Sequence, residues 1–247
     1  MPRNIKLTLE YDGTNYCGWQ IQVGLRTIQG EIRGVLRELT NEKNLTLTGV
    51  GRTDAGVHAL NYVASFKTNS VVSVEGILMG LNSMLSKDIA VKKVSEVALD
   101  FDARRSALSK TYLYRLYKNK TRSALYRDRA WHFKWALDVP LMKKGAELFL
   151  GEKDFSTFCA TGSNSKTFIR NITSFTVADV DGGFVEFEVQ GKSFLRHMVR
   201  IMVGTLVQLG RGKISLADVE RIIKACDRES APFTAPSKGL FLKSVEY

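Results

Sequence analysis

The chain has 247 residues, of which 44% are hydrophobic and 25% charged, a composition typical of a folded globular protein and not of a disordered one. Its 36 lysines and arginines against 25 aspartates and glutamates leave a formal net charge of +11, which favours a polyanionic partner such as nucleic acid. No apolar run approaches the ~18 residues of a membrane-spanning helix, and no apolar segment follows the first residues. We therefore expect a cytoplasmic protein without membrane association.

The three cysteines and three histidines show no metal-binding or redox pattern. Cys17, Cys159 and Cys226 lie far apart, which fits a reducing compartment and predicts three small buried side chains. The histidines are equally scattered, and no HExxH sequence occurs. We expect neither a metal nor a cofactor.

The first half of the chain predicts the β-α-β-β-α-β order of a ferredoxin-like unit. The expected elements are a strand at residues 5–10, a helix from Thr27 to Leu39, strands at residues 45–50 and 60–66, a helix from Ser73 to Leu85 and a strand at residues 89–97. Period-two alternation indicates the strands, and the helices show an apolar face behind a hydroxyl cap.

The same order returns in the second half, so we expect two domains, residues 1–103 and 104–247. The expected elements are a strand at residues 111–117, a helix from Asp138 to Leu150, a hairpin of residues 169–180 and 184–189, helices from Ser193 to Gly210 and from Ser215, and a strand at residues 240–245. The predicted fold class is α+β, with two βαββαβ halves.

The loop GRTDAGVHA, residues 51–59, carries the carboxylate best placed for chemistry. Asp54 lies two residues after Arg52, and glycines on both sides of it permit a tight turn. An aspartate in such a sequence is more often a plain turn residue that bonds its own backbone. The loop alone does not decide between a catalytic group and a turn.

Residues 103–134 combine positive charge with aromatic rings. Ten basic residues stand there against one acid, Asp128, and six aromatic residues lie among them. Basic groups hold phosphates while aromatic faces stack on unpaired bases, so the segment predicts a nucleic-acid-binding surface. Within it, Tyr112 and Tyr114 share one face of their strand.

Two arginines mark the helix expected from Ser193. Arg196 and Arg200 are predicted one turn apart on the same face of that helix. Because Arg200 lies in an apolar stretch, we expect a carboxylate partner for it.

Several segments together resemble the tRNA pseudouridine synthase A family. They are YDGTNYCGWQIQ at residues 11–22, RTIQGE at 26–31, GRTDAGVHA at 51–59, FDAR at 101–104 with KTYLY at 110–114, FLRHMVR at 194–200 and APSKGL at 235–240. They occur in the order found in the family and extend to the C-terminal end of the chain.

The resemblance implies two βαββαβ halves with joined, mainly antiparallel sheets and a basic active-site cleft between them. It also implies a homodimer that acts without a cofactor on the anticodon stem-loop of tRNA. The implied reaction is the isomerisation of uridine to pseudouridine at nominal tRNA positions 38–40, on a base that is flipped out of its stack.

The resemblance further implies roles for single residues. Asp54 would be the nucleophile, Arg200 its basic partner, Tyr112 the tyrosine that stacks on the flipped base, Arg52 the residue that takes the place of that base, Arg104 a further substrate contact and Arg196 at most a phosphate contact. Attack on the ribose C1′ and attack on the uracil C6 both remain open.

Two other interpretations remain open as well. A non-catalytic tandem RNA-binding module would fit the repeated topology and the charge, and it predicts that Asp54→Asn changes nothing. A basic small-molecule enzyme would turn over free uridine or a nucleotide, and added salt would not affect it.

Overall fold

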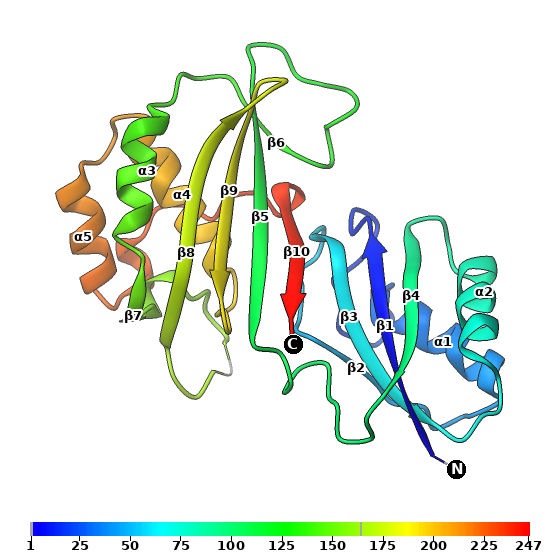
Figure 1. Cartoon of the computed structure of the whole chain (residues 1–247). Helices are drawn as coiled ribbons and strands as arrows, with labels where there is room; N and C mark the ends of the chain where they lie inside the picture. The colour runs from blue at the N-terminus through cyan, green and yellow to red at the C-terminus, as the bar shows by residue number, and fades with distance from the viewer. Residues whose placement is uncertain (1, 164) are drawn as a thin grey trace. The chain divides into compact units, whose positions relative to one another are not determined.

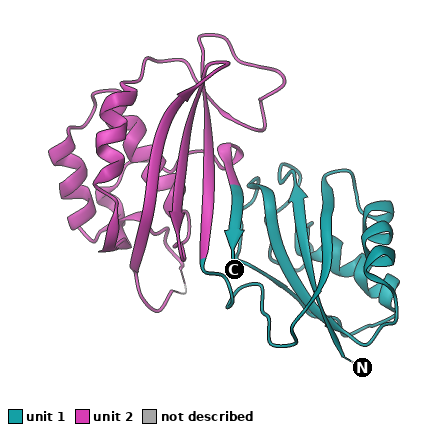
Figure 2. Ribbon diagram, viewed as in Figure 1, with its two compact units in different colours: residues 1–108, 242–247 teal, residues 109–241 magenta. Residues whose placement is uncertain are grey.

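The structure is a computed structural model that describes residues 2–163 and 165–247. Its contacts divide the chain into two compact units (Figure 2). Unit 1 comprises Met1–Leu108 with Leu242–Tyr247, and unit 2 comprises Ser109–Phe241. The last residues of the chain thus return to the unit in which the chain begins.

Unit 1 has the predicted β-α-β-β-α-β order. Its elements are β1 (Arg3–Tyr11), α1 (Ile28–Thr40), β2 (Leu47–Gly49), β3 (His58–Thr68), α2 (Val74–Met84) and β4 (Ile89–Val97) (Figure 1). The strands lie in the order β4-β1-β3, with β2 paired to β3 and every pairing antiparallel. Strand β10 (Leu240–Glu246), most of which belongs to this unit, follows β3 in the sheet.

Local sequence explains these elements well. The Thr27 side chain accepts a hydrogen bond from the backbone of α1, and the Ser73 side chain does the same for α2, so both predicted caps are confirmed. On β1, Ile5 and Leu7 are fully buried while Lys6 between them is not. One face of the sheet therefore forms the core, as alternation predicts.

Unit 2 contains the elements predicted for the second half except the last strand, β10, most of which belongs to unit 1, and it has two additional short strands. Its elements are β5 (Ser109–Lys118), β6 (Trp131–Phe133), α3 (Val139–Glu147), β7 (Gly151–Asp154), β8 (Ile169–Val180), β9 (Phe184–Gly191), α4 (Met198–Gly210) and α5 (Leu216–Lys224), with short 3₁₀ turns at Ser156–Phe158, Arg228–Ser230 and Ser237–Gly239. The strands lie in the order β5-β9-β8-β7 with antiparallel pairing, and β6 runs parallel to β5.

The helices of unit 2 gather on one side of its sheet (Figure 1). Val185, Phe187 and Val189 alternate along β9 and are fully buried. Nearly every residue of α4 is buried too, so this helix forms the centre of the unit. Its apolar composition follows from that position, because only Arg200 and Gln208 of its residues are partly exposed.

The helix predicted from Ser193 is present, but its predicted first residue is wrong. Helix α4 begins at Met198, and His197 before it has φ +61°, a left-handed conformation that interrupts the helix. The Arg196 carbonyl accepts a hydrogen bond of 3.0 Å from the Ala160 backbone instead of an intrahelical one. Arg196 therefore precedes the helix and does not share a helical face with Arg200.

Two smaller expectations also need correction. Helix α3 ends at Glu147 and not at Leu150, because Gly151 already begins β7. Only Cys159 is a buried cysteine, since Cys17 is half-buried and Cys226 is exposed.

The predicted fold class is confirmed: both units are α+β with mainly antiparallel strands. The joining of the two sheets and the basic cleft between the halves stay predictions. Among the described residues, no helix combines the length and the apolar character needed to cross a bilayer.

Candidate active site

Asp54 lies on the loop that connects β2 with β3 in unit 1. Its side chain is half-buried, and that of Arg52 is exposed. The Val57 backbone donates a 3.2 Å hydrogen bond to the Asp54 carbonyl, and Gly56 has φ +75°. The segment is thus the tight turn that its sequence indicates, and a positive φ there suits glycine.

Three aromatic residues hold the part of the loop that precedes Asp54. The Tyr11 hydroxyl and the Thr53 Oγ1 are hydrogen-bonded at 2.9 Å in a buried position, and the Trp19 backbone donates to the Thr53 carbonyl at 3.2 Å. The Tyr62 hydroxyl donates to the Gly51 carbonyl. Because the Trp19 and Tyr62 rings also stack at 4.1 Å, the three aromatic side chains form one support under the loop.

Glycines of the segment between β1 and α1 touch the same loop directly. A Cβ at Gly18, which has φ +85°, would lie 2.3 Å from the Thr53 carbonyl oxygen, and one at Gly13 would lie 2.0 Å from that of Val57. On the far side of Asp54, the Gly56 backbone donates to the Tyr16 carbonyl at 3.3 Å. Segments 11–22 and 51–59, far apart in the sequence, therefore form one structure around Asp54.

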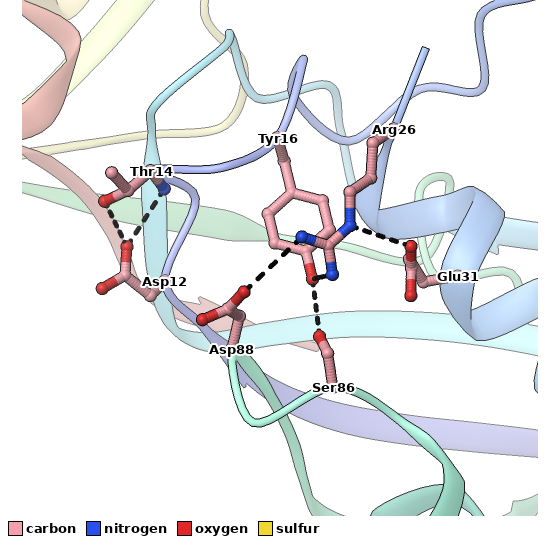
Figure 3. A network of polar contacts seen from close by, with 7 residues as sticks. All are labelled: Asp12, Thr14, Tyr16, Arg26, Glu31, Ser86 and Asp88. Atoms are coloured by element: carbon pink, nitrogen blue, oxygen red, sulfur yellow. Dashed lines mark hydrogen bonds and ion pairs between the residues drawn. The ribbon is translucent and has the colours of Figure 1, made fainter. Parts of the chain in front are cut away.

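A polar network fixes the segment that carries Tyr16 (Figure 3). The Tyr16 hydroxyl lies 2.8 Å from the Ser86 hydroxyl, and the Arg26 guanidinium lies 4.5 Å above the Tyr16 ring. Arg26 also donates to Glu31 at 3.0 Å and lies 3.8 Å from an Asp88 oxygen. The Glu31 bond raises the pKa of Arg26, and burial raises the pKa of Tyr16, so both keep their protons. The network thus ties this segment to α1 and to the turn before β4.

Arg104 is the other predicted site residue in unit 1. It is exposed on a turn in which an Asp102 carboxylate oxygen accepts the backbone N–H groups of Arg104 and Arg105 at 2.9 and 2.8 Å. The neighbouring Ala103 backbone donates to the Ser65 hydroxyl of β3 at 3.1 Å. The turn is therefore fixed to β3, the strand that follows the Asp54 loop.

Tyr112 and Arg200 belong to unit 2. Tyr112 pairs with buried Val189 and is half-buried, and the Phe194 ring meets its ring edge-on at 4.9 Å. Arg200 is half-buried in α4, and its Nε donates to the Ala235 carbonyl at 2.8 Å. The carboxylate partner predicted for Arg200 stays a prediction.

Tyr114 is a residue whose role the sequence alone did not indicate. It is fully buried, its hydroxyl donates to the Pro236 carbonyl at 2.9 Å, and its burial raises its pKa well above the ordinary value. Ala235, the residue before Pro236, forms two hydrogen bonds with Arg200. Its carbonyl accepts from Arg200 Nε, and its N–H donates to the Arg200 carbonyl at 3.1 Å. Tyr114 and Arg200 therefore hold the same short segment. The sequence signal that could have revealed Tyr114 is its position two residues after Tyr112, on the same face of β5.

The described residues include no group of three or more His, Cys, Asp or Glu side chains arranged to hold a metal ion.

A sequence profile of the family described as tRNA pseudouridine synthase matches residues 8–104 and 146–247. The chain belongs to this family. The tRNA pseudouridine synthase A of Acetivibrio thermocellus is 45% identical over 245 residues, which cover 99% of this chain and 100% of that protein. The enzymes of the same name from Caldicellulosiruptor bescii and Geotalea daltonii are 43% and 44% identical over the same length. A tRNA pseudouridine synthase is an isomerase, so the family fixes the class of reaction.

Solved structures resemble the chain more distantly. A chain in a structure of an H/ACA ribonucleoprotein bound to a substrate RNA has a TM-score of 0.39 and 10% identity. The match covers 82% of this chain and 44% of that longer one. A similarity at this level adds nothing to the assignment that the close relatives provide.

Proposed function

We propose that this tRNA pseudouridine synthase acts on the anticodon stem-loop, at nominal positions 38–40, with Asp54 as its nucleophile. The substrate is the one implied by the family, and the observation that carries the role of Asp54 is the anchoring of its loop. Backbone or side-chain bonds hold Gly51, Thr53 and Gly56, while the Asp54 side chain is left half-buried. A nucleophile needs a fixed position and access to its substrate, and this loop provides both.

The reaction is a redox-neutral rearrangement. The bond between uracil N1 and ribose C1′ breaks, a bond between C5 and C1′ forms, the proton on C5 leaves, and N1 gains one. A carboxylate can hold one fragment covalently while the base turns, by attack either on C1′ or on the ring carbon C6. Neither route requires a cofactor.

The remaining site residues have roles that follow from their chemistry. Tyr112 would receive the face of the flipped base, and Phe194 at its edge would fix the ring. Arg52, exposed beside Asp54, would occupy the space that the base leaves in the RNA. Arg104 would contact a phosphate, and Arg200 would keep Asp54 charged and oriented.

These roles require the two halves to work together. The half with residues 1–103 would bring the Asp54 loop, and the half with residues 104–247 would bring Tyr112 and the basic helix. We further propose that the enzyme works as a homodimer in the cytoplasm, where its tRNA substrates are.

Release of tritium from tRNA labelled at C5 of uridine tests the proposed function. We expect release from labelled tRNA to stop when the anticodon stem-loop carries cytidine at positions 38–40. Binding of tRNA without any release would favour a non-catalytic RNA-binding module. Turnover of free uridine without salt dependence would favour a small-molecule enzyme.

A further inference from the structure

The loop between β5 and β6, residues 119–130, carries four basic residues and one acid. We propose that this loop binds the sugar–phosphate backbone of tRNA at a point remote from the nucleotide that is modified. The proposal extends the proposed function, since it rests on Tyr112 as the residue that receives the target base.

The backbone of the loop is fixed by its own polar side chains. The Asn119 side chain accepts the Thr121 N–H at 3.0 Å, and the Asn119 backbone donates to the Phe133 carbonyl at 3.2 Å. The Ser123 hydroxyl accepts the N–H groups of Leu125 and Tyr126 at 3.2 and 3.3 Å. Cations on an ordered loop lose less conformational entropy on binding than cations on a mobile one.

Aromatic rings fix the base of the loop. The Tyr126 ring meets the Phe184 ring edge-on at 4.9 Å and lies 5.9 Å from the Tyr117 ring. Tyr117 in turn lies 5.3 Å from Phe184. These rings, which the sequence suggested as stacking surfaces for bases, pack on one another, although Tyr126 stays 42% exposed, and Tyr114 and Phe133 on the flanking strands are buried. The loop therefore offers RNA four cationic side chains and one partly packed aromatic ring.

Strand β5 and the loop differ in how many of their basic side chains pair with an acid. On β5, Arg115 pairs with Glu186 at 2.8 Å and Lys118 with Asp179 at 2.7 Å. In the loop the sole acid, Asp128, lies 3.0 Å from Arg127 and so balances one cation. The loop as a segment keeps a net positive charge, and Lys120 and Arg122 are exposed on it. Such groups attract phosphates, whatever the base sequence.

The position of the loop along β5 defines which part of the RNA it can reach. Tyr112 lies near the start of β5 and the loop follows its last residue, Lys118. At about 3.3 Å per residue, the strand places the loop roughly 20 Å from Tyr112. A base held at Tyr112 and a phosphate held by the loop therefore belong to different nucleotides, which lie roughly 20 Å apart in the bound RNA.

The test compares two double variants with the same change in charge. Lys120→Ala with Arg122→Ala alters the loop, and Lys143→Ala with Lys144→Ala removes two exposed lysines from α3 of the same unit. For full-length tRNA we expect the loop variant to bind roughly tenfold more weakly, with the slope of log affinity against log salt smaller by about 1 to 2. The α3 variant should keep the slope of the wild-type protein.

A minimal anticodon hairpin with a shortened stem gives the second measurement. We expect both variants to bind this hairpin as the wild-type protein does, because it is too short to reach the loop. Equal slopes in all three proteins on full-length tRNA would overturn the proposal. If the loop variant loses as much affinity for the minimal hairpin as for full-length tRNA, the contact is not remote and the proposal is overturned. Absence of pseudouridine from the wild-type reaction would instead contradict the proposed function, since the binding slopes are measured independently.

Discussion

At the scale of single residues, Asp54 owes its position to the contacts of its neighbours. Asp54 follows Thr53, whose hydroxyl is bonded to Tyr11 and whose carbonyl accepts from Trp19. Each bond contributes about 1 kcal/mol, but together they leave the peptide before Asp54 little freedom. The position of the carboxylate therefore depends on residues that are themselves buried beneath the loop.

Replacement of Tyr11 by Phe tests this support. The variant loses the buried bond to Thr53, so we expect the free energy of unfolding to fall by about 1–3 kcal/mol. We also expect slower formation of pseudouridine with unchanged tRNA affinity. Thr40→Val is the matched control, since it removes a buried hydroxyl that bonds the Leu36 carbonyl in α1 of the same unit. If both variants turn over tRNA at the wild-type rate, Tyr11 does not position Asp54.

The buried hydroxyl of Tyr114 predicts a loss of stability in alkali. Burial raises the pKa of Tyr114 in the folded protein, whereas in the unfolded chain it stays near its ordinary value of about 10. The stabilising contribution is thus fully present below pH ~10. It is lost as the pH rises further, because the unfolded state then releases a proton that the folded state retains.

Urea unfolding at several pH values between about 9 and 12 measures this effect. We expect the free energy of unfolding of the wild-type protein to decrease more steeply above pH ~10 than that of Tyr114→Phe. Parallel curves for the two proteins would show that Tyr114 does not contribute. Comparison with the variant isolates Tyr114 from other groups that titrate in the same range, such as Lys6, whose pKa is lowered by burial and by Lys93.

At the scale of elements, the surroundings of Asp54 are formed by two loops that pack against each other. The segment between β1 and α1 lies against the Asp54 loop through Gly13 and Gly18, and the network around Tyr16 and Arg26 ties it to neighbouring elements. Anything that moves this segment should move Asp54 with it.

Gly18→Ala and Gly24→Ala form a matched pair for this claim. Both glycines lie in the segment before α1 and have positive φ, +85° and +74°, so each alanine is strained by about 1–2 kcal/mol. A Cβ at Gly24 meets nothing within 4 Å, whereas one at Gly18 lies 2.3 Å from the Thr53 carbonyl oxygen. We expect Gly24→Ala to retain its activity and Gly18→Ala to lose at least tenfold in turnover. Equal activity in the two variants would contradict the dependence of Asp54 on this segment.

The elements also show what sequence patterns can and cannot predict. The sequence predicts that helices begin at Thr27, Ser73, Asp138 and Ser215, and all four prove to be N-caps, because a cap bonds a backbone N–H only three residues away. The start of α4 is not predicted correctly, because the left-handed backbone at His197 has no local sequence signal. Strands β6 and β7 are not predicted for a similar reason: three or four residues are too few to show a period, and their pairing partners lie 15–21 residues away, beyond the reach of local patterns.

At the scale of the whole molecule, the proposed site residues come from both units. Asp54, Arg52 and Arg104 lie in unit 1, and Tyr112 and Arg200 lie in unit 2. Resemblance to the family named these residues, whereas composition and periodicity showed only a basic chain with a loop aspartate. The supports of Asp54 could not be predicted from periodicity, because Tyr11, Trp19 and Tyr62 converge on the loop only after β1 and β3 have paired.

The most direct test of Asp54 as the nucleophile is a single-turnover measurement of pseudouridine in tRNA with Asp54→Asn. Asparagine keeps the size of the side chain and removes the charge, so we expect tRNA affinity within about twofold of the wild-type value and no detectable pseudouridine. Pseudouridine formed by Asp54→Asn at a rate near that of the wild-type enzyme would contradict the account.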